Sequence, residues 1–309
     1  MKPHLDQLWS ELASTEAGEK SEVLGHLYQG LKQVDDPGRF EVGQQCVELL
    51  VAEESWEEAF DLGHDLSSDL IESARTDDAR VLIESLLHHE LFVAHNFVGL
   101  LRWNYADIFR REDNFSIAAI EFRHAFETFR EDDRFPRACL AQYEGEALRK
   151  LGHFEYALKR LCLAVDLFES EGFIEGVAVC KRHVAGLLIQ MCKPSMAIAY
   201  ATEAKLLYEF MRKPSECQKT DVVLGQAQSA AGELELARET LTQASVMRGN
   251  DAQNRIAVEA LFYLAEVTLR SGDVIQAGNK FREVAPLLRA TNQVDLEELA
   301  LTYTSGGEG

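Results

Sequence analysis

Residues 145–164 read GEALRKLGHFEYALKRLCLA, and this stretch decides the fold. Gly145 and Ala157 are small residues on two successive predicted helices, where small side chains let antiparallel backbones approach closely. Leu148 fills the seam between the helices, and Gly152 ends the first helix because glycine readily adopts a positive φ. The stretch therefore predicts a helix, a tight turn and a second, antiparallel helix.

The same alanine position recurs every 40 residues, within a similar pattern of small and apolar residues, at Ala157, Ala197, Ala237 and Ala277. Weaker copies of the pattern are centred on Ala118 and Ala59. The copy around Ala197 departs most, because Cys192 and Pro194 replace the usual glycine and apolar residue, and we expect its turn to be distorted.

The repeated pattern resembles the tetratricopeptide repeat (TPR) family, in a long version with units of about 40 residues instead of about 34. The resemblance covers roughly residues 40–290. It implies an all-α fold, a TPR-like α-solenoid in which antiparallel helix pairs stack into a right-handed superhelix around one core. The repeat length and an N-terminal helical module are loosely similar to those of bacterial peptide-sensing regulators of the Rap type.

We divide the chain into three parts. Residues 1–76 form an acidic N-terminal helical module with one degenerate repeat, residues 77–290 a TPR-like repeat array, and residues 291–309 a capping helix and flexible tail. The centres Ala59 and Ala118 lie 59 residues apart, about 19 more than the regular period. The inserted helical segment at 77–111 contains no proline, and the sequence leaves open whether it forms one helix or two.

The resemblance also implies a partner-binding site, because in this family the first helix of each unit lines a concave groove. Carried over by position, the groove residues are Trp103, Asp107, Arg110, Gln142, Glu146, Arg149, Arg182, Ile189, Gln226, Phe262 and Arg270. Arg110, Arg149 and Arg182 would form a stripe that accepts an acidic or C-terminal peptide, since guanidinium groups bind carboxylates bidentately. The alternative is that these arginines pair internally with Asp107 and Glu146 across neighbouring helices.

Acidic residues concentrate at the N-terminal end. The first 100 residues hold 21 Asp and Glu against 6 Lys and Arg, in a chain of formal net charge −21. Such a surface repels phosphate backbones and attracts a basic partner, so we expect no direct binding to nucleic acid. Asp61, Asp65 and Asp69 lie at i, i+4 and i+8 of one predicted helix, which we interpret as a solvated face. The alternative function is an acidic inhibitor that imitates DNA and occupies a nucleic-acid-binding protein.

No catalytic motif is present: the sequence has no GxSxG, no phosphate-binding glycine loop and no GxGxxG between a strand and a helix. Glu84, His88 and His95 fall at i, i+4 and i+11, on one helical face, which makes a metal-dependent helical enzyme the second alternative. No HExxH or equivalent completes a ligand set. We therefore expect a non-catalytic protein with no catalytic residues, no metal and no cofactor.

The six cysteines form no CxxC pair, and we expect most of them to be buried free thiols in a reducing compartment. No segment reaches the roughly 18 uninterrupted apolar residues of a membrane span, and the N-terminus lacks the pattern of a secretory signal. We expect a cytoplasmic, regulatory scaffold whose partner is another protein or peptide and which does not bind a membrane. Trp9, if exposed, or an uncapped end of the solenoid would support a homodimer.

Overall fold

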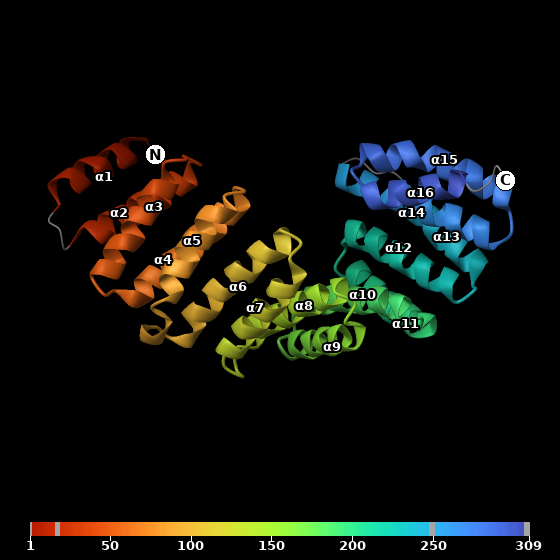
Figure 1. The fold of residues 1–309 in the computed structure, drawn as a ribbon, viewed down its shortest axis with the longest axis horizontal. Coiled ribbons are helices and arrows are strands. Elements are labelled where there is room, and N and C mark those ends of the chain that lie inside the picture. The colour runs from red at the N-terminus through yellow and green to blue at the C-terminus, as the bar shows by residue number, and fades with distance from the viewer. Residues whose placement is uncertain (1, 16–18, 247–250, 306–309) are drawn as a thin grey trace. The chain divides into compact units, whose positions relative to one another are not determined.

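The computed structural model describes residues 2–15, 19–246 and 251–305 (Figure 1). Within these residues the regular structure is helical and no strand occurs, so the all-α prediction is confirmed. The chain divides into two compact units, Met1–Gly152 and His153–Gly309. Among the described helices, none combines the length and the hydropathy that a membrane span requires.

The first unit is a row of antiparallel helices, each packed against its neighbours in sequence. Its helices are α1 (Lys2–Ser14), α2 (Lys20–Gln33), α3 (Arg39–Ala52), α4 (Trp56–Glu72), α5 (Thr76–Leu87), the 3-10 helix η2 (Glu90–Phe92), α6 (His95–Arg111), α7 (Phe115–Thr128) and α8 (Arg134–Lys150). Tyr28, Phe60 and Leu101 are fully buried in the core of this unit. Their burial between helices supplies the main stabilising term, because apolar surface leaves water.

The inserted segment at 77–111 forms two helices, α5 and α6, which resolves the question that the sequence left open. The short helix η2 lies between them, where the ring of Trp56 stacks on His89 at 4.7 Å and on Phe92 at 5.5 Å. Helix α4 contacts α6 in addition to α5, as α10 contacts α12 in the second unit. Helix α4 therefore takes the place of a first helix of a pair, whereas the sequence pattern placed Ala59 in a second helix.

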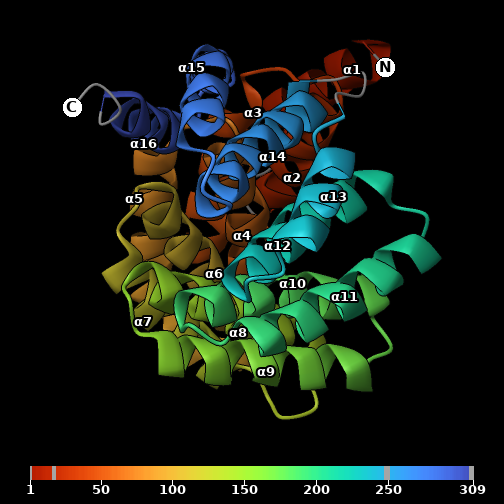
Figure 2. The same ribbon diagram turned by 90° about the vertical axis from the view of Figure 1, so that its right-hand side faces the viewer.

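The second unit contains α9 (Phe154–Ser170), α10 (Ile174–Gln190), α11 (Pro194–Phe210), α12 (Pro214–Ala230), α13 (Leu234–Ala244), α14 (Asp251–Arg270), α15 (Val274–Ala290) and α16 (Val294–Ser305). Figure 2 shows α12, α13 and α14 side by side. The four alanines that recur every 40 residues are fully buried, at the predicted close contacts between helices. Pro194 and Pro214 open α11 and α12, where a missing backbone N–H leaves no bond unmade.

The turns of this unit follow one pattern. Gly232 has φ 85° and its N–H donates to the carbonyl of Ser229 at 3.1 Å. Cys192 has φ 57°, and its N–H donates to the carbonyl of Ile189 at 3.0 Å. The prediction that the Cys192 turn is distorted is therefore wrong. The same backbone hydrogen bond holds Cys192 in the left-handed conformation that Gly232 adopts in its turn.

The last helix, α16, closes the second unit. Ala300 is fully buried against α14 and α15, and the ring of Tyr303 stacks on Phe281 at 4.6 Å. Helix α16 is the capping helix that the sequence predicted within residues 291–309. The expected tail spans residues 305–309; Ser305 is the last residue of α16, and residues 306–309 lie outside the described residues.

Candidate partner-binding surfaces

On α6, the structure pairs Arg110 internally. Its Nε donates to Asp107 Oδ1 at 2.7 Å, and its guanidinium lies 5.7 Å from the centre of the Tyr143 ring on α8. The second carboxylate oxygen of Asp107 accepts from Arg111 at 2.7 Å. Trp103 lies one turn before Asp107 and is half-buried. The centre of its ring lies 6.0 Å from that of the Tyr143 ring. Arg110 therefore pairs internally, but with Asp107 of its own helix and not across neighbouring helices as expected.

On α8, the three nominated side chains are half-buried. Gln142 donates to Glu146 at 2.9 Å along the helix. Arg149 forms no ion pair with any residue that the structure describes, so the expected pairing with Glu146 is not observed. Among Arg110, Arg149 and Arg182, Arg149 is thus the arginine whose guanidinium remains available to an acidic group of a partner.

In the second unit, Arg182 on α10 also pairs within the chain, with a residue that sequence reasoning did not name. Its Nη1 donates to Glu216 Oε2 on α12 at 2.7 Å, and its guanidinium lies over the Tyr208 ring at 5.6 Å. Burial raises the pKa of Glu216, but hydrogen bonds from Lys219 and Arg182 outweigh burial and hold it below its usual range. Arg182 therefore joins α10 to α12 and does not extend an anion-accepting stripe.

The remaining nominated residues of the second unit differ in exposure. Ile189 and Gln226 are half-buried, and Arg270 is exposed and donates to the carbonyl of Ser229 at 3.3 Å. Phe262 has 0% exposed surface and packs against Phe281 with ring centres 5.5 Å apart. Its nomination as a partner-contacting residue is wrong, because it belongs to the core of this unit.

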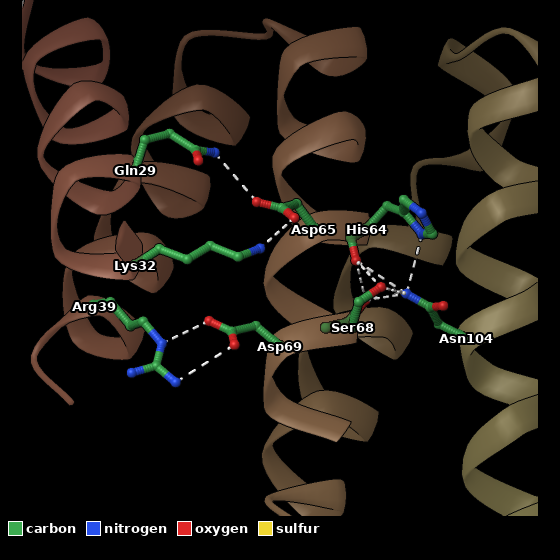
Figure 3. A network of polar contacts seen from close by, with 9 residues as sticks. Gln29, Lys32, Arg39, His64, Asp65, Ser68, Asp69 and Asn104 are labelled. Carbon is green, nitrogen blue, oxygen red and sulfur yellow. Dashed lines mark hydrogen bonds and ion pairs between the residues drawn. The ribbon is translucent and has the colours of Figure 1, made fainter. Parts of the chain in front are cut away.

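Helix α4 in the first unit carries a polar network on two faces (Figure 3). Toward α2, Asp65 accepts from Lys32 at 2.5 Å and from Gln29 at 3.2 Å. Toward the start of α3, Asp69 accepts from Arg39 Nε at 2.7 Å. Burial raises the pKa of Asp65, but hydrogen bonding to Lys32 outweighs it and holds the pKa below the usual range. The interpretation of these carboxylates as a solvated face is wrong for Asp65 and Asp69, which join helices.

Toward α6, the amide of Asn104 inserts among polar groups of α4. Its Nδ2 lies 2.8 Å from Ser67 Oγ, 2.9 Å from Ser68 Oγ and 3.0 Å from both the carbonyl oxygen and Nδ1 of His64. Burial lowers the pKa of His64, because a charged imidazole is less well solvated there than in water. The first helices of successive pairs in this unit are thus joined by polar contacts.

A pocket of about 810 Å³ opens between α2, α3 and α4, and we call it the α2–α4 pocket. Its carboxylates are Glu22, Glu58, Asp61 and Asp65, and it has no Lys or Arg among its lining residues. Sequence reasoning missed this site because it placed α4 in a second helix. The insertion of about 19 residues between the Ala59 and Ala118 centres could have indicated the shifted pairing, because it has the length of one extra helix and its turn.

The proposed metal ligands do not share a helical face. Glu84 lies on α5, His88 directly follows the end of α5, and His95 begins α6. Glu84 accepts a hydrogen bond from the hydroxyl of Tyr105 at 2.7 Å. No group of three or more potential ligands within residues 2–15, 19–246 and 251–305 has the arrangement of a metal site. The helical-face argument for a metal enzyme is therefore wrong, because the helix ends between the ligands.

The cysteines are free thiols, as expected, but fewer are buried than predicted. Cys46 and Cys180 are buried, Cys192 is exposed, and the other three are half-buried. Burial raises the pKa of the Cys46 and Cys139 thiols to about 11 each. Thiols held so far above their ordinary pKa are poor nucleophiles at neutral pH.

Comparison with solved structures finds the same fold in proteins of low sequence identity. A Rap protein complexed with competence and sporulation factor is 12% identical, with 97% of this chain and 79% of that chain covered and a TM-score of 0.60. A signal-transduction ATPase (STAND) with a tetratricopeptide repeat sensor from Pyrococcus horikoshii is 15% identical, with 93% and 49% covered and a TM-score of 0.62. BtubC (BKLC) from P. vanneervenii is 18% identical, with 76% and 92% covered and a TM-score of 0.52.

No protein-family model matches the sequence, and the comparison with curated proteins gives no match either. The 40-residue recurrence of buried alanines, the paired antiparallel helices and these structural likenesses agree with one another. The chain has the α-solenoid fold of the tetratricopeptide repeat proteins, and in this fold it is similar to Rap proteins.

Proposed function

We propose that this protein is a non-catalytic, regulatory scaffold of the cytoplasm that binds a basic segment of another protein in the α2–α4 pocket. The observation that carries the proposal is the lining of this pocket, which holds four carboxylates and no Lys or Arg. Guanidinium and ammonium groups complement such a lining, because each forms charge-assisted hydrogen bonds with carboxylates. The negative charge of the first 100 residues would also speed the approach of a basic partner.

The walls of the pocket are held in place before any partner arrives. The Lys32–Asp65 ion pair and the Gln29–Asp65 hydrogen bond join α2 to α4 at one end of the pocket. Glu58 and Asp61 are exposed and form no ion pair within the described part of the chain. A partner would therefore meet helices that are already joined, and its binding would lose free energy only to the ordering of the exposed Glu58 and Asp61 side chains.

The nominated groove residues extend this proposal along the first helices of the pairs. In the first unit, Trp103 and Arg149 are half-buried on α6 and α8 and offer an aromatic ring and a guanidinium without an ion pair, whereas the amide of Gln142 is bonded to Glu146. A partner segment with an acidic residue beyond its basic stretch would use Arg149. In the second unit, Ile189 and Gln226 are the half-buried nominated residues and carry no charge.

The acidic surface does not support a DNA-imitating inhibitor through the stripe that suggested it. Two of the three carboxylates, Asp65 and Asp69, pair with cations of the same unit, and only Asp61 is exposed. A row of phosphate-like charges needs all three to face solvent. The pocket therefore favours recognition of a protein segment, and direct binding to nucleic acid is not part of the proposal.

The test uses an extended, fluorescein-labelled peptide of alternating Arg and Ser, and a second peptide with Glu in place of Arg, in fluorescence anisotropy titrations. We expect the Arg peptide to bind and the pair Glu58→Lys and Asp61→Lys to weaken binding about tenfold, through loss of attraction and added repulsion. Glu41→Lys with Glu48→Lys makes the same change of charge on α3 and is the matched control. Equal binding of both peptides, or equal weakening by the control pair, refutes the pocket.

A further inference from the structure

The first unit contains another cavity, of about 440 Å³, between α3 and α5. We call it the α3–α5 cavity. Its volume falls within the range of about 300–1,000 Å³ that is usual for small-molecule sites in proteins. Apolar side chains from three helices line it, namely Phe40 and Val47 of α3, Leu66 and Leu70 of α4, and Val81 and Leu82 of α5.

The apolar lining residues differ in exposure from the base of the cavity to its mouth. Val47, Leu66 and Leu70 are at most 4% exposed and close the base, whereas Val81 is 67% exposed and lies at the mouth. A water molecule at the base would find few of the about two to four polar partners that hold a buried water well. An occupant that replaces such poorly bonded water with apolar contacts therefore gains free energy.

The polar lining residues are already bonded within the first unit. Gln44 Nε2 donates to Glu48 Oε1 at 3.2 Å, and Arg75 Nε donates to Asp78 Oδ2 at 2.7 Å. Ser85 donates to a backbone carbonyl of its own helix at 2.7 Å. All five side chains are exposed, so water can serve their remaining hydrogen bonds. The lining thus leaves apolar contact, and not polar bonding, as its main unmet capacity.

The charges of the lining disfavour an ionic occupant. Glu48 and Asp78 carry the negative charges of the lining, and Arg75 is its one guanidinium. This guanidinium is paired with Asp78 and lies 4.6 Å from the centre of the Phe40 ring. An anion would therefore meet Glu48 without a free Lys or Arg among the lining residues, and a cation would have to leave water for an apolar base. A neutral occupant avoids both costs.

One lining residue belongs to an aromatic stack. The rings of His89 and Trp56 are stacked with their centres 4.7 Å apart, so the cavity offers an aromatic surface to a flat ligand. An apolar cavity of about 150 Å³ holds one benzene ring, so about 440 Å³ admits two or three rings. A helix of three turns would occupy about 1,300 Å³, and the cavity could admit only some of its side chains.

We propose that the α3–α5 cavity binds a neutral, apolar small molecule of two or three aromatic rings. The rings pack on Leu66 and Leu70 at the base and against the ring of His89, and Val81 contacts them at the mouth. Binding is driven by the removal of apolar surface from water on both the ligand and the cavity. This site is separate from the α2–α4 pocket, does not depend on it, and adds a small-molecule ligand to a scaffold that binds proteins.

The experiment uses two fluorescent probes with the same ring system. N-Phenyl-1-naphthylamine is neutral, whereas 8-anilino-1-naphthalenesulfonate carries an added sulfonate. We expect the neutral probe to bind at one site per chain and to receive excitation energy from Trp56, which stacks on the lining residue His89. The sulfonate should displace it only at concentrations at least tenfold higher, because its charge meets Glu48 without a free guanidinium. Trp56→Phe should lower the energy transfer and leave the probe bound.

A matched pair of variants tests the location of the site. Val81→Glu places a charge at the mouth of the cavity and should weaken binding of the neutral probe at least tenfold. Ile120→Glu makes the same kind of change on α7, at a position that is 53% exposed and does not line the cavity, and should leave binding unchanged. Both side chains are exposed, so the variants are expected to fold, and circular dichroism checks this.

The proposal is overturned by absence of saturable binding of the neutral probe, by displacement at equal concentrations of the sulfonate, or by equal effects of Val81→Glu and Ile120→Glu. Energy transfer that Trp56→Phe leaves unchanged would place the probe elsewhere and also overturn it. Sedimentation of the free protein tests another occupant. A dimer that Val81→Glu dissociates overturns the proposal in favour of a second copy of the chain.

Discussion

Replacing Asp69 with alanine removes one partner of the most deeply buried ion pair of the first unit. The side chains of Arg39 and Asp69 are 8% and 10% exposed, and Arg39 Nε lies 2.7 Å from Asp69 Oδ2. Breaking a buried pair by removing one partner costs about 3–5 kcal/mol, because the other charge stays buried without compensation. Arg39 keeps an ion pair with Asp35 at 2.9 Å and a bond to the carbonyl of Asp36 at 3.1 Å. We therefore expect a loss near the lower end, about 3 kcal/mol.

The assay is urea unfolding followed by tryptophan fluorescence. All three tryptophans, Trp9, Trp56 and Trp103, lie in the first unit, so the signal reports unfolding of that unit. With a slope of about 2 kcal/mol per molar urea, a loss of about 3 kcal/mol lowers the midpoint by about 1.5 M. Asp61→Ala on the same helix is the control, because Asp61 is exposed and without an ion pair, and it should change stability by less than about 0.5 kcal/mol.

A double variant distinguishes the cost of leaving Arg39 unpaired from other effects of replacing Asp69. Arg39→Met with Asp69→Leu replaces both charges with apolar groups of similar volume, and such replacements are often neutral or stabilising. We expect the double variant to recover most of the stability that Asp69→Ala loses. If Asp69→Ala lowers stability by less than about 1 kcal/mol, or if the double variant is as unstable as the single one, an uncompensated buried charge is not the cause.

Further predictions concern the rest of the network and one turn. Asn104→Ala should destabilise the first unit by about 1–2 kcal/mol in the same urea assay, because polar groups of α4 lose their shared donor; no change would mean that water replaces the amide. Since burial lowers the pKa of His64 below its unfolded value, neutral His64 contributes stability that is present above the unfolded pKa and is lost as the pH falls below it. The His64→Gln variant should therefore lose less stability than wild type between pH 7.5 and pH 5. An equal loss would show that His64 is not the source of the pH dependence. Cys192→Gly should raise the melting temperature of the second unit by about 3 °C in calorimetry, because glycine relieves the strain of a positive φ; a lower temperature would show that the cysteine is not strained.

The helices and turns of the second unit were largely predictable, because they depend on residues that are close together in the sequence. The buried alanines follow from a constant 40-residue period, and the turn at Gly232 follows from the freedom of glycine at positive φ. The groove positions were harder to predict, because one residue on a helix changes direction by about 100°. Phe262 was assigned to the groove by counting from the repeat, yet it points into the core, and the adjacent Tyr263 is half-buried.

The polar contacts of the first unit could not be predicted from spacing along the chain. Lys32 and Asp65 are 33 residues apart, and Asn104 reaches His64 across 40 residues. Whether a carboxylate faces solvent or a cation depends on which helices pack together. The sequence pattern placed α4 in the wrong position of its pair, so the partners of its carboxylates could not be predicted. The three-part division of the chain at residues 76 and 290 remains a prediction.

The α2–α4 pocket differs from the α3–α5 cavity, and the contrast follows from how the helices of the first unit are joined. Polar contacts concentrate where α4 faces α2 and α6, and the pocket on the α2 side is lined by carboxylates, of which Asp65 is held by Lys32 and Gln29. The α3–α5 cavity has Leu66 and Leu70 of α4 among its apolar lining residues, and one of its two carboxylates, Asp78, is paired with Arg75. An extended basic segment can satisfy the first cavity without apolar side chains, whereas the second offers most of its binding surface to apolar groups. Charge alone would therefore not direct one partner to both cavities. The extended peptide of Arg and Ser, which has no apolar side chain, should bind in the α2–α4 pocket alone, and equal weakening by Glu41→Lys with Glu48→Lys would contradict this.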